Sequence, residues 1–399
     1  MRPRPAAKAV INARVKGTLA ALAAVLAALV GVTGCDEGTT PASPVAIDST
    51  PAPPSGTTTP SSTEDPGPRS FDLVMGGDLL WHNTTWFSAA EDAAGTPERY
   101  DWDPMFATLR PLVQGADLAI CHTELPFALP GAEPESYPVF AAPRSIAPWI
   151  ASMGWDACTT ASNHSWDGGF EGVVTTADLL EANGVEHVGT FRTPREREQP
   201  VVLTTENGVR VGLVAGTYGL NGFVPPADEE FAISMGDADN LLAKARAARE
   251  AGADVLVVHV HWGWEYVHEP SPEQVALAEA LTASPDVDVV LGEHAHVVQP
   301  ITRVNGKWVV YGMGNQVAQN EATRPATYEG ITVHLEFTER PGGGFRVSRA
   351  AYVPTQWNHY SPGNPIRIVP AVGDRLASIR RAVDLLGGNR GLREDRAAS

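Results

Sequence analysis

Short aliphatic runs that end in polar residues recur along the chain from Phe71 onward. Five of these runs predict buried strands, at residues 71–78, 116–124, 156–164, 253–262 and 287–296. Stretches with helical spacing lie between them, at residues 105–114, 173–184, 240–252 and 272–284. Alternating strands and helices indicate βαβ units and an α/β fold. Because open α/β sheets bind ligands at the carboxyl ends of their strands, the polar strand ends are candidates for one cleft.

The C-terminal part of the chain has a different pattern. Residues 308–316, 330–338 and 345–354 predict strands, and a Pro-Gly-rich turn joins the last two. These strands favour a second, more antiparallel sheet packed against the first. An amphipathic helix near 373–386 is expected next, followed by a disordered polar tail.

The first 35 residues have the character of a leader. Basic residues precede an uncharged apolar stretch from Leu19 to Val30, which is shorter than the roughly 20 residues of a spanning helix. The segment Val32-Thr33-Gly34-Cys35 resembles the bacterial lipoprotein box, so we expect lipidation of Cys35 and an extracytoplasmic protein anchored to the cell membrane. An ordinary cleaved secretory peptide with a chance cysteine is the alternative. Residues 36–69 lack aromatic residues and are rich in Pro, Ser, Thr and Gly, which predicts a disordered linker.

The remaining residues fit one large α/β domain at 70–372, with the helix and tail at 373–399. Five of the 29 Lys and Arg residues lie in the leader, which leaves 24 against 47 Asp and Glu and a net charge near −23. This charge disfavours nucleic acid and anionic lipid surfaces as partners. Cys121 and Cys158 each end a predicted strand and could form a disulfide outside the cytosol, or remain two buried thiols.

The strand ends supply two carboxylates, four imidazoles and one amide. They are Asp78, Glu124, Asn163, His164, His261, His294 and His296. This set suits a pair of divalent Mn, Fe or Zn ions. Two ions about 3.5 to 4 Å apart could share one carboxylate for metal-assisted hydrolysis. The pair His294 and His296 alone is a weaker signal, although side chains two apart on a strand face the same side.

Six segments resemble, in order, the bacterial capsule-synthesis or poly-gamma-glutamate biosynthesis family (CapA) of the calcineurin-like metallophosphoesterase superfamily. They are GGDLL, the Glu of CHTEL, ASNHSWDGG, HVHWGWEY, GEHAHVVQP and VVYGMGN, and they span about residues 71–320. The resemblance implies a four-layer αββα sandwich with a dinuclear metal cleft at the strand ends. It also implies a functional link to an envelope polymer.

The resemblance assigns a role to each candidate. Asp78 and His296 are implied to hold the first metal, and Asn163, His261 and His294 the second, with Glu124 bridging both. Glu124 and His164 are the catalytic candidates. His164 would donate a proton to the leaving group or orient the substrate, which requires an imidazole that titrates near the working pH.

The chain departs from the wider superfamily at several positions. Leu80 stands where a DxH motif has its histidine, so the first metal would be weakly held or absent. His82 could reach around a turn to replace that histidine, or it is a surface-loop residue. Glu293 stands where relatives often have another histidine, and Gln316 where they tend to have an aromatic residue. Both changes could alter the substrate.

Several residues around these motifs have two possible roles. His259 faces the same way as His261, and we prefer His261 as the ligand because it directly precedes Trp262-Gly263, as in the family motif. His259 then supports the ligands or lies in the core. Asp167 shapes the loop around His164 or serves as a turn residue.

A polar-aromatic patch follows His261 and could form a binding wall for a sugar or peptide. The alternative is that its tryptophans cap the core. The substrate-binding candidates are His82, Trp262, Glu265, Tyr266 and Asn315. Trp264 belongs to the same patch, and Tyr311 is a candidate with Asn315 on the opposite rim.

Two functions fit these features. The first is a lipid-anchored, metal-dependent hydrolase with two divalent ions, acting on a cell-envelope polymer or its phosphorylated or γ-glutamyl precursor. The second is a non-catalytic assembly or export factor that binds the anionic polymer within a membrane polymer-synthase complex. A periplasmic-type binding protein is a weaker third possibility, because such chains lack this metal-ligand set.

Overall fold

A computed structural model describes residues 67–320 and 322–396 as a mixed α/β domain built on two sheets. The predicted leader, Cys35 and residues 36–66 of the linker lie outside the described residues. Within the described ranges, every helix is too short or too polar to cross a bilayer.

The first sheet has nine strands in the order β14-β13-β12-β1-β2-β3-β4, with β11 beside β1 and β15 beside β13. Strands β1 to β4 are parallel, and β12, β13 and β14 continue the sheet antiparallel from β1. The strand bounds are β1 Ser70–Leu79, β2 Leu118–Thr123, β3 Ala157–Thr159, β4 Glu186–Val188, β11 Asn315–Val317, β12 Glu329–Glu339, β13 Phe345–Trp357, β14 Ile368–Pro370 and β15 Leu392–Glu394.

The second sheet has six strands in the order β5-β6-β7-β8-β10-β9. Its four central strands are parallel, and β5 and β9 form antiparallel edges. The bounds are β5 Val201–Thr204, β6 Arg210–Thr217, β7 Val255–His261, β8 Val289–Glu293, β9 Ile301–Val304 and β10 Lys307–Val310. The central strands are rich in Val and Leu because both of their faces are buried.

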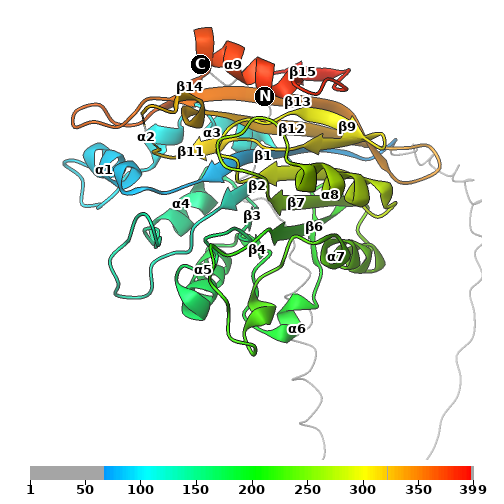
Figure 1. Ribbon diagram of the computed structural model, residues 1–399, viewed down its shortest axis with the longest axis horizontal. Coiled ribbons are helices and arrows are strands. Elements are labelled where there is room, and N and C mark those ends of the chain that lie inside the picture. The colour runs from blue at the N-terminus through cyan, green and yellow to red at the C-terminus, as the bar shows by residue number, and fades with distance from the viewer. Residues whose placement is uncertain (1–66, 321, 397–399) are drawn as a thin grey trace, which may run out of the picture. The chain divides into compact units, whose positions relative to one another are not determined.

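Helices cover the outer faces of both sheets. In Figure 1, α1 to α4 lie on one side of the strands and α7 and α8 on the other. The bounds are α1 Asn83–Asp92, α2 Asp103–Phe106, α3 Arg110–Gly115, α4 Ile146–Met153, α5 Gly169–Ala182, α6 Pro194–Arg197, α7 Ala238–Glu250, α8 Pro272–Ala283 and α9 Gly373–Asp384, with short 3-10 turns at Glu230–Ala232 and Pro325–Tyr328. Helix α8 begins with a capping box in which Ser271 and Gln274 bind each other's backbone N–H groups.

Three hydrophobic clusters define the layers. Side chains of both sheets, including Leu73 of β1 and Leu291 of β8, form a core between them. A second cluster joins the outer face of the nine-stranded sheet, including Val74, to the helices around α4. A third joins the six-stranded sheet to α7 and α8. The predicted four-layer αββα sandwich is therefore confirmed.

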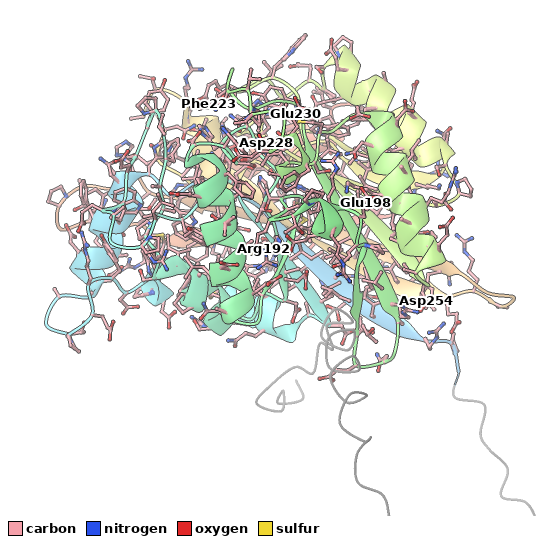
Figure 2. All side chains as sticks on the ribbon, turned by 90° about the horizontal axis from the view of Figure 1, so that it is seen from below. Arg192, Glu198, Phe223, Asp228, Glu230 and Asp254 are labelled. Carbon is pink, nitrogen blue, oxygen red and sulfur yellow. A yellow bond between two sulfur atoms is a disulfide. The ribbon has the colours of Figure 1, made fainter. Side chains whose placement is uncertain are left out.

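Charged side chains also connect elements at the edge of the nine-stranded sheet. Arg192, labelled in Figure 2, binds Asp178 and Glu181 of α5 and Glu196 of α6. The buried ring of His187 on β4 lies 3.4 Å from carboxylate oxygens of both Glu181 and Glu196. This network holds the two helices against β4.

Three predictions about the C-terminal part were wrong. Strands β12 and β13 do not form a separate sheet, because β12 pairs with the edge that β1 would otherwise leave open and β13 pairs with β12. The predicted strand at 308–316 is divided between β10 and β11, which belong to different sheets. Residues 392–394 of the predicted disordered tail form β15, which pairs with β13.

Candidate metal centre

The carboxyl ends of strands from both sheets meet at one place. Asp78 is the penultimate residue of β1, Glu124 directly follows β2, and His261 ends β7. Gly77 allows β11 to approach, since a Cβ at this position would collide with the carbonyl oxygen of Gly314. The six predicted ligands are all buried, with at most 5% of any of them exposed: Asp78, Glu124, Asn163, His261, His294 and His296.

Four donor atoms surround the position predicted for the second metal. His261 Nε2 lies 2.8 Å from Asn163 Oδ1, 3.1 Å from His294 Nδ1 and 3.9 Å from Glu124 Oε1. Metal bonds of about 2.1 Å place two ligands of a tetrahedral ion about 3.4 Å apart. The three distances measured from His261 Nε2 bracket this value.

Fewer donors surround the position predicted for the first metal. His296 Nδ1 lies 3.1 Å from Asp78 Oδ2, and His296 Nε2 lies 3.9 Å from Glu124 Oε1. Glu124 Oε1 thus faces both donor groups, as a bridging carboxylate must. His82 does not complete this group, because its ring packs against Phe140 at a centroid distance of 5.2 Å on the wall of a cavity.

An unpredicted histidine lies against the predicted ligands. His122 Nε2 is 3.7 Å from Asp78 Oδ1 and 3.1 Å from His261 Nδ1. The sequence carried a signal for it, since His122 precedes Glu124 by two residues and extended backbone places such residues on one face.

The electrostatics of the centre favour a bound cation. Asp78 Oδ1 and both carboxylate oxygens of Glu124 are buried and lack a hydrogen-bond partner within 67–320 and 322–396. Burial raises the pKa of Glu124 and lowers the pKa values of His261 and His294. Burial opposes charge on His296 as well, but Glu124 and Asp78 raise its pKa to about 10. A cation that binds neutral imidazoles and ionised carboxylates would satisfy these groups, so the residues fit a metal.

The rings of His294 and His296 are not brought together by the alternation of side chains along a strand. Strand β8 ends at Glu293, and His294 and His296 have φ values of 100° and 55°. This left-handed backbone is uncommon for residues other than glycine and is held only where the surroundings enforce it. The prediction that the strand extends to residue 296 was therefore wrong, although both rings still reach the centre.

A cavity of about 800 Å³ opens beside the centre. Its wall includes Asn163, His164 and His296 from the predicted site and His82, Glu265 and Tyr266 from the predicted substrate-binding set. Residues from three separate loops also line it and were not predicted: Tyr137, Phe140, Asn221, Phe223, Gln319, Asn320 and Arg324. The Arg324 guanidinium lies 4.3 Å from the centre of the Tyr266 ring, which places a positive charge on the wall.

Two substrate-binding candidates do not lie on this wall. Trp262 is buried and donates its indole N–H to the Tyr311 carbonyl oxygen at 2.8 Å, so it caps the core as the alternative had it. Asn315 is also buried, and its Oδ1 lies 3.0 Å from His296 Nδ1. Asn315 therefore holds the ring of the predicted ligand His296 through this contact.

His164 lies on the cavity wall and is held by a carboxylate. Its Nδ1 is 2.7 Å from Asp167 Oδ2, and its ring packs edge-on against Phe140 at 4.8 Å. Asp167 Oδ2 also accepts a hydrogen bond from the Phe140 backbone N–H at 2.8 Å. Asp167 therefore both shapes the loop and orients His164.

The other residues with two possible roles lie behind the centre. His259 is buried, and neither of its ring nitrogens has a hydrogen-bond partner in the described part of the chain. Glu293 is equally buried, and burial raises the pKa of its carboxyl. Gln316 accepts a hydrogen bond from Thr332 at 3.0 Å.

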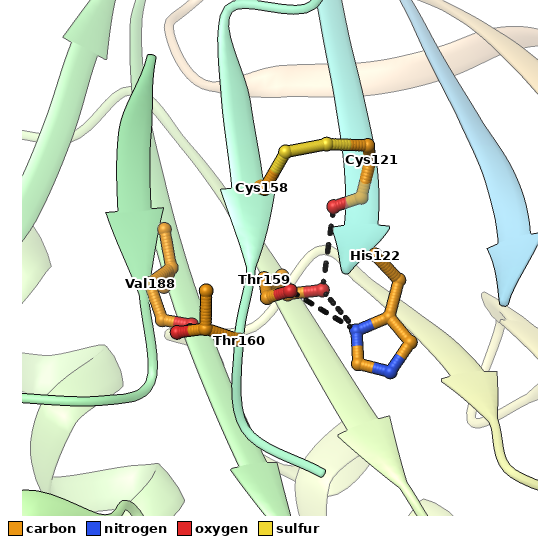
Figure 3. The surroundings of a disulfide bond; sticks show 6 residues. All are labelled: Cys121, His122, Cys158, Thr159, Thr160 and Val188. Carbon is orange, nitrogen blue, oxygen red and sulfur yellow. Dashed lines mark hydrogen bonds between the residues drawn. A yellow bond between two sulfur atoms is a disulfide. The ribbon is translucent and has the colours of Figure 1, made fainter. Parts of the chain in front are cut away.

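Cys121 and Cys158 form a disulfide between β2 and β3. They are direct neighbours in the parallel pairing, with Cα atoms 4.4 Å apart, and Figure 3 shows the bond beside His122 and Thr159. The disulfide therefore fixes the two strands one residue before His122.

Comparison with known proteins identifies related sequences. The family model described as bacterial capsule synthesis protein PGA_cap matches residues 72–320. The capsule biosynthesis protein CapA of Bacillus anthracis is 27% identical over 247 residues, which is 59% of each chain. The PGA biosynthesis protein CapA of Bacillus subtilis (strain 168) is 28% identical over 208 residues, or 50% of this chain and 51% of the relative.

A probable polyglutamine synthesis accessory protein of Mycobacterium tuberculosis is 26% identical over 250 residues, or 60% of this chain and 63% of the relative. The chain thus spans between about half and two thirds of the length of these relatives. Similar solved structures include the calcineurin-like phosphoesterase YfkN from Bacillus subtilis, at 15% identity and a TM-score of 0.45, covering 72% of this chain and 91% of that one. A putative 5'-nucleotidase from Staphylococcus aureus has 14% identity and a TM-score of 0.45, covering 79% and 58%.

Proposed function

Because this chain belongs to the bacterial capsule synthesis protein family, we propose that it is a metal-dependent hydrolase that acts on an envelope polymer or its precursor. The resemblance of its motifs to that family is confirmed. The names of the relatives support a role related to capsule biosynthesis as part of the proposal. The proposal adds hydrolysis, two divalent ions and an extracytoplasmic location with a lipid anchor at Cys35.

The observation that carries the proposal is the set of six buried donors beside an open cavity. Asp78 Oδ1 and both Glu124 oxygens lack a hydrogen-bond partner among the described residues, and the cavity beside them gives a substrate access. Divalent ions held there would supply Lewis-acid activation of water and of the scissile group. Mn, Fe and Zn all suit this mixture of imidazole, carboxylate and amide donors.

The side chains of the cavity supply the remaining chemistry. Asp167 accepts a hydrogen bond from His164 Nδ1, which leaves Nε2 to donate a proton to the leaving group. Arg324 on the cavity wall offers a positive charge to an anionic substrate. Phosphorylated and γ-glutamyl groups both carry such charge.

The test uses purified chain that begins at Asp36. Metal content, phosphodiester cleavage and γ-glutamyl amide cleavage would be measured for the parent and for Glu124→Ala and His261→Ala. Both variants should lose metal and activity, whereas Glu250→Ala, on the outer helix α7, should retain them. Equal activity in all four proteins, or none with any of the three metals, would refute hydrolysis.

A second candidate function is a non-catalytic assembly or export factor that binds an anionic polymer. It is favoured by the buried Leu80 in place of a ligand histidine and by the position of His82 on the cavity wall. The mycobacterial relative carries the name of a synthesis accessory protein. In cells, Cys35→Ala would then abolish polymer export while His261→Ala leaves it intact, and the opposite pattern would exclude this function.

A further inference from the structure

A chain of buried contacts runs from β3 through β2 to the predicted ligand His261. His122 Nδ1 lies 2.8 Å from the Thr159 hydroxyl and 3.2 Å from the Thr159 carbonyl oxygen, as Figure 3 shows. On the other side of the ring, His122 Nε2 lies 3.1 Å from His261 Nδ1. His122 and His261 are completely buried, so water cannot substitute for either contact.

The Thr159 carbonyl oxygen determines which ring nitrogen of His122 carries the hydrogen. A carbonyl oxygen can only accept, so His122 Nδ1 carries the hydrogen and His122 Nε2 presents a lone pair. His261 Nδ1 can donate to that lone pair when Nε2 gives up the hydrogen that it shares with Asn163 Oδ1 at 2.8 Å, as Nε2 would on binding a metal beside Asn163, His294 and Glu124. Nε2 is the nitrogen that a metal between these donors requires.

We propose that His122 is a positioning residue that holds the His261 ring in the tautomer and orientation needed to bind the second metal. The inference rests on the proposed metal binding and goes beyond it, since His122 is not among the six predicted ligands. It also gives the Cys121–Cys158 disulfide a role, because the disulfide fixes β2 and β3 next to the His122–Thr159 contact.

His122 could instead bind a metal itself, because its Nε2 is 3.7 Å from Asp78 Oδ1. Two observations favour the positioning role. The 3.1 Å separation from His261 Nδ1 is that of a hydrogen bond, which occupies the only free lone pair of His122. In addition, His261 already directs its other nitrogen at the donors of the second metal.

The experiment compares three variants of the full chain with the parent. His122→Phe keeps a ring but removes both nitrogens, whereas His122→Gln retains an acceptor near the position of Nε2. His259→Phe is the matched control, because His259 is a buried histidine whose ring centre is 4.6 Å from that of His122. Mn²⁺ and Zn²⁺ affinities would be measured by chelator competition, and the ligand environment by the visible absorption of Co²⁺.

We expect His122→Phe to keep the parent's metal stoichiometry at saturation but to weaken one site by roughly 10- to 100-fold, with a changed Co²⁺ spectrum. His122→Gln and His259→Phe should stay close to the parent. Loss of one whole equivalent in His122→Phe would make His122 a ligand and overturn the inference. Parent-like affinity in His122→Phe, or equal weakening in His259→Phe, would also overturn it while leaving the proposed function intact. A parent chain that binds no metal would refute both.

Discussion

Replacing Glu124 with methionine should stabilise the metal-free domain and remove the stabilisation that bound metal gives to the parent. Both carboxylate oxygens of Glu124 are buried without a hydrogen-bond partner in the described residues, and burial raises the pKa of this group. An unsatisfied buried polar group costs about 1–3 kcal/mol, and methionine fills a similar volume without polar oxygens. In a chelator, Glu124→Met should therefore unfold at a temperature about 1–4 °C higher than the parent.

Added metal should reverse the order of the two unfolding temperatures, so that the parent unfolds at a higher temperature than Glu124→Met. A ligand at 100 times its Kd stabilises the folded state by about 2.7 kcal/mol, and the parent should gain this while Glu124→Met gains little. Thermal unfolding followed by circular dichroism, in EDTA and in excess Mn²⁺, measures both effects. Glu293→Met is the control, since it removes another unpartnered buried carboxyl that lies outside the two donor groups. It should be stabilised in EDTA and still respond to metal.

The reasoning fails if Glu124→Met is less stable than the parent in EDTA. That result would mean that the carboxyl contributes favourable interactions to the metal-free fold. It also fails if the variant gains as much stability from metal as the parent, because Glu124 would then not be a ligand.

Three further predictions concern other parts of the domain. Replacing Cys121 and Cys158 with alanine opens a loop whose ends are 37 residues apart, which should lower the free energy of unfolding by about 4 kcal/mol in urea titrations, and an unchanged midpoint would contradict this. The close contact with the His187 ring lowers the pKa of Glu181 from 4.5 to about 2, so the contribution of this carboxylate to stability is present above pH 4.5 and is lost as the pH falls toward 2. Glu181→Gln should reduce the fall in the free energy of unfolding between pH 4.5 and 2, measured by unfolding at several pH values. An unchanged fall would exclude Glu181 as its cause. His164→Asn should lower kcat by roughly 10²- to 10⁴-fold with unchanged metal content, and full activity would remove His164 as the proton donor.

The parts of the site that lie at strand ends could be predicted from the sequence. Asp78, Glu124 and His261 follow aliphatic runs, and parallel strands bring such ends to one edge. The four-layer fold followed from the family resemblance, and the buried outer and inner faces of the strands agree with it. Local pattern and motif were sufficient for these features.

Features that depend on distant contacts could not be predicted. The hydrophobic pattern of β12 does not say which edge it joins, so its pairing with β1 was missed. The left-handed backbone at His294 and His296 is imposed by surrounding structure, and an alternating pattern cannot reveal it. The cavity wall was missed for the same reason, since Tyr137, Phe223 and Arg324 come from loops far apart in the chain. The role of Trp262 stayed open between binding wall and core because an aromatic side chain after a strand can face either the solvent or the core, and the structure buries it.

The donors are shared between the two halves of the sandwich. Asp78, Glu124 and Asn163 are carried by the nine-stranded sheet and its loops, and His261, His294 and His296 by the six-stranded sheet. An ion bound by ligands from both sheets would crosslink the two sheets, and neither sheet alone has enough ligands to retain it. Metal escape during gradual denaturation would therefore mark the moment at which the halves separate, even while each sheet keeps its own hydrogen bonds.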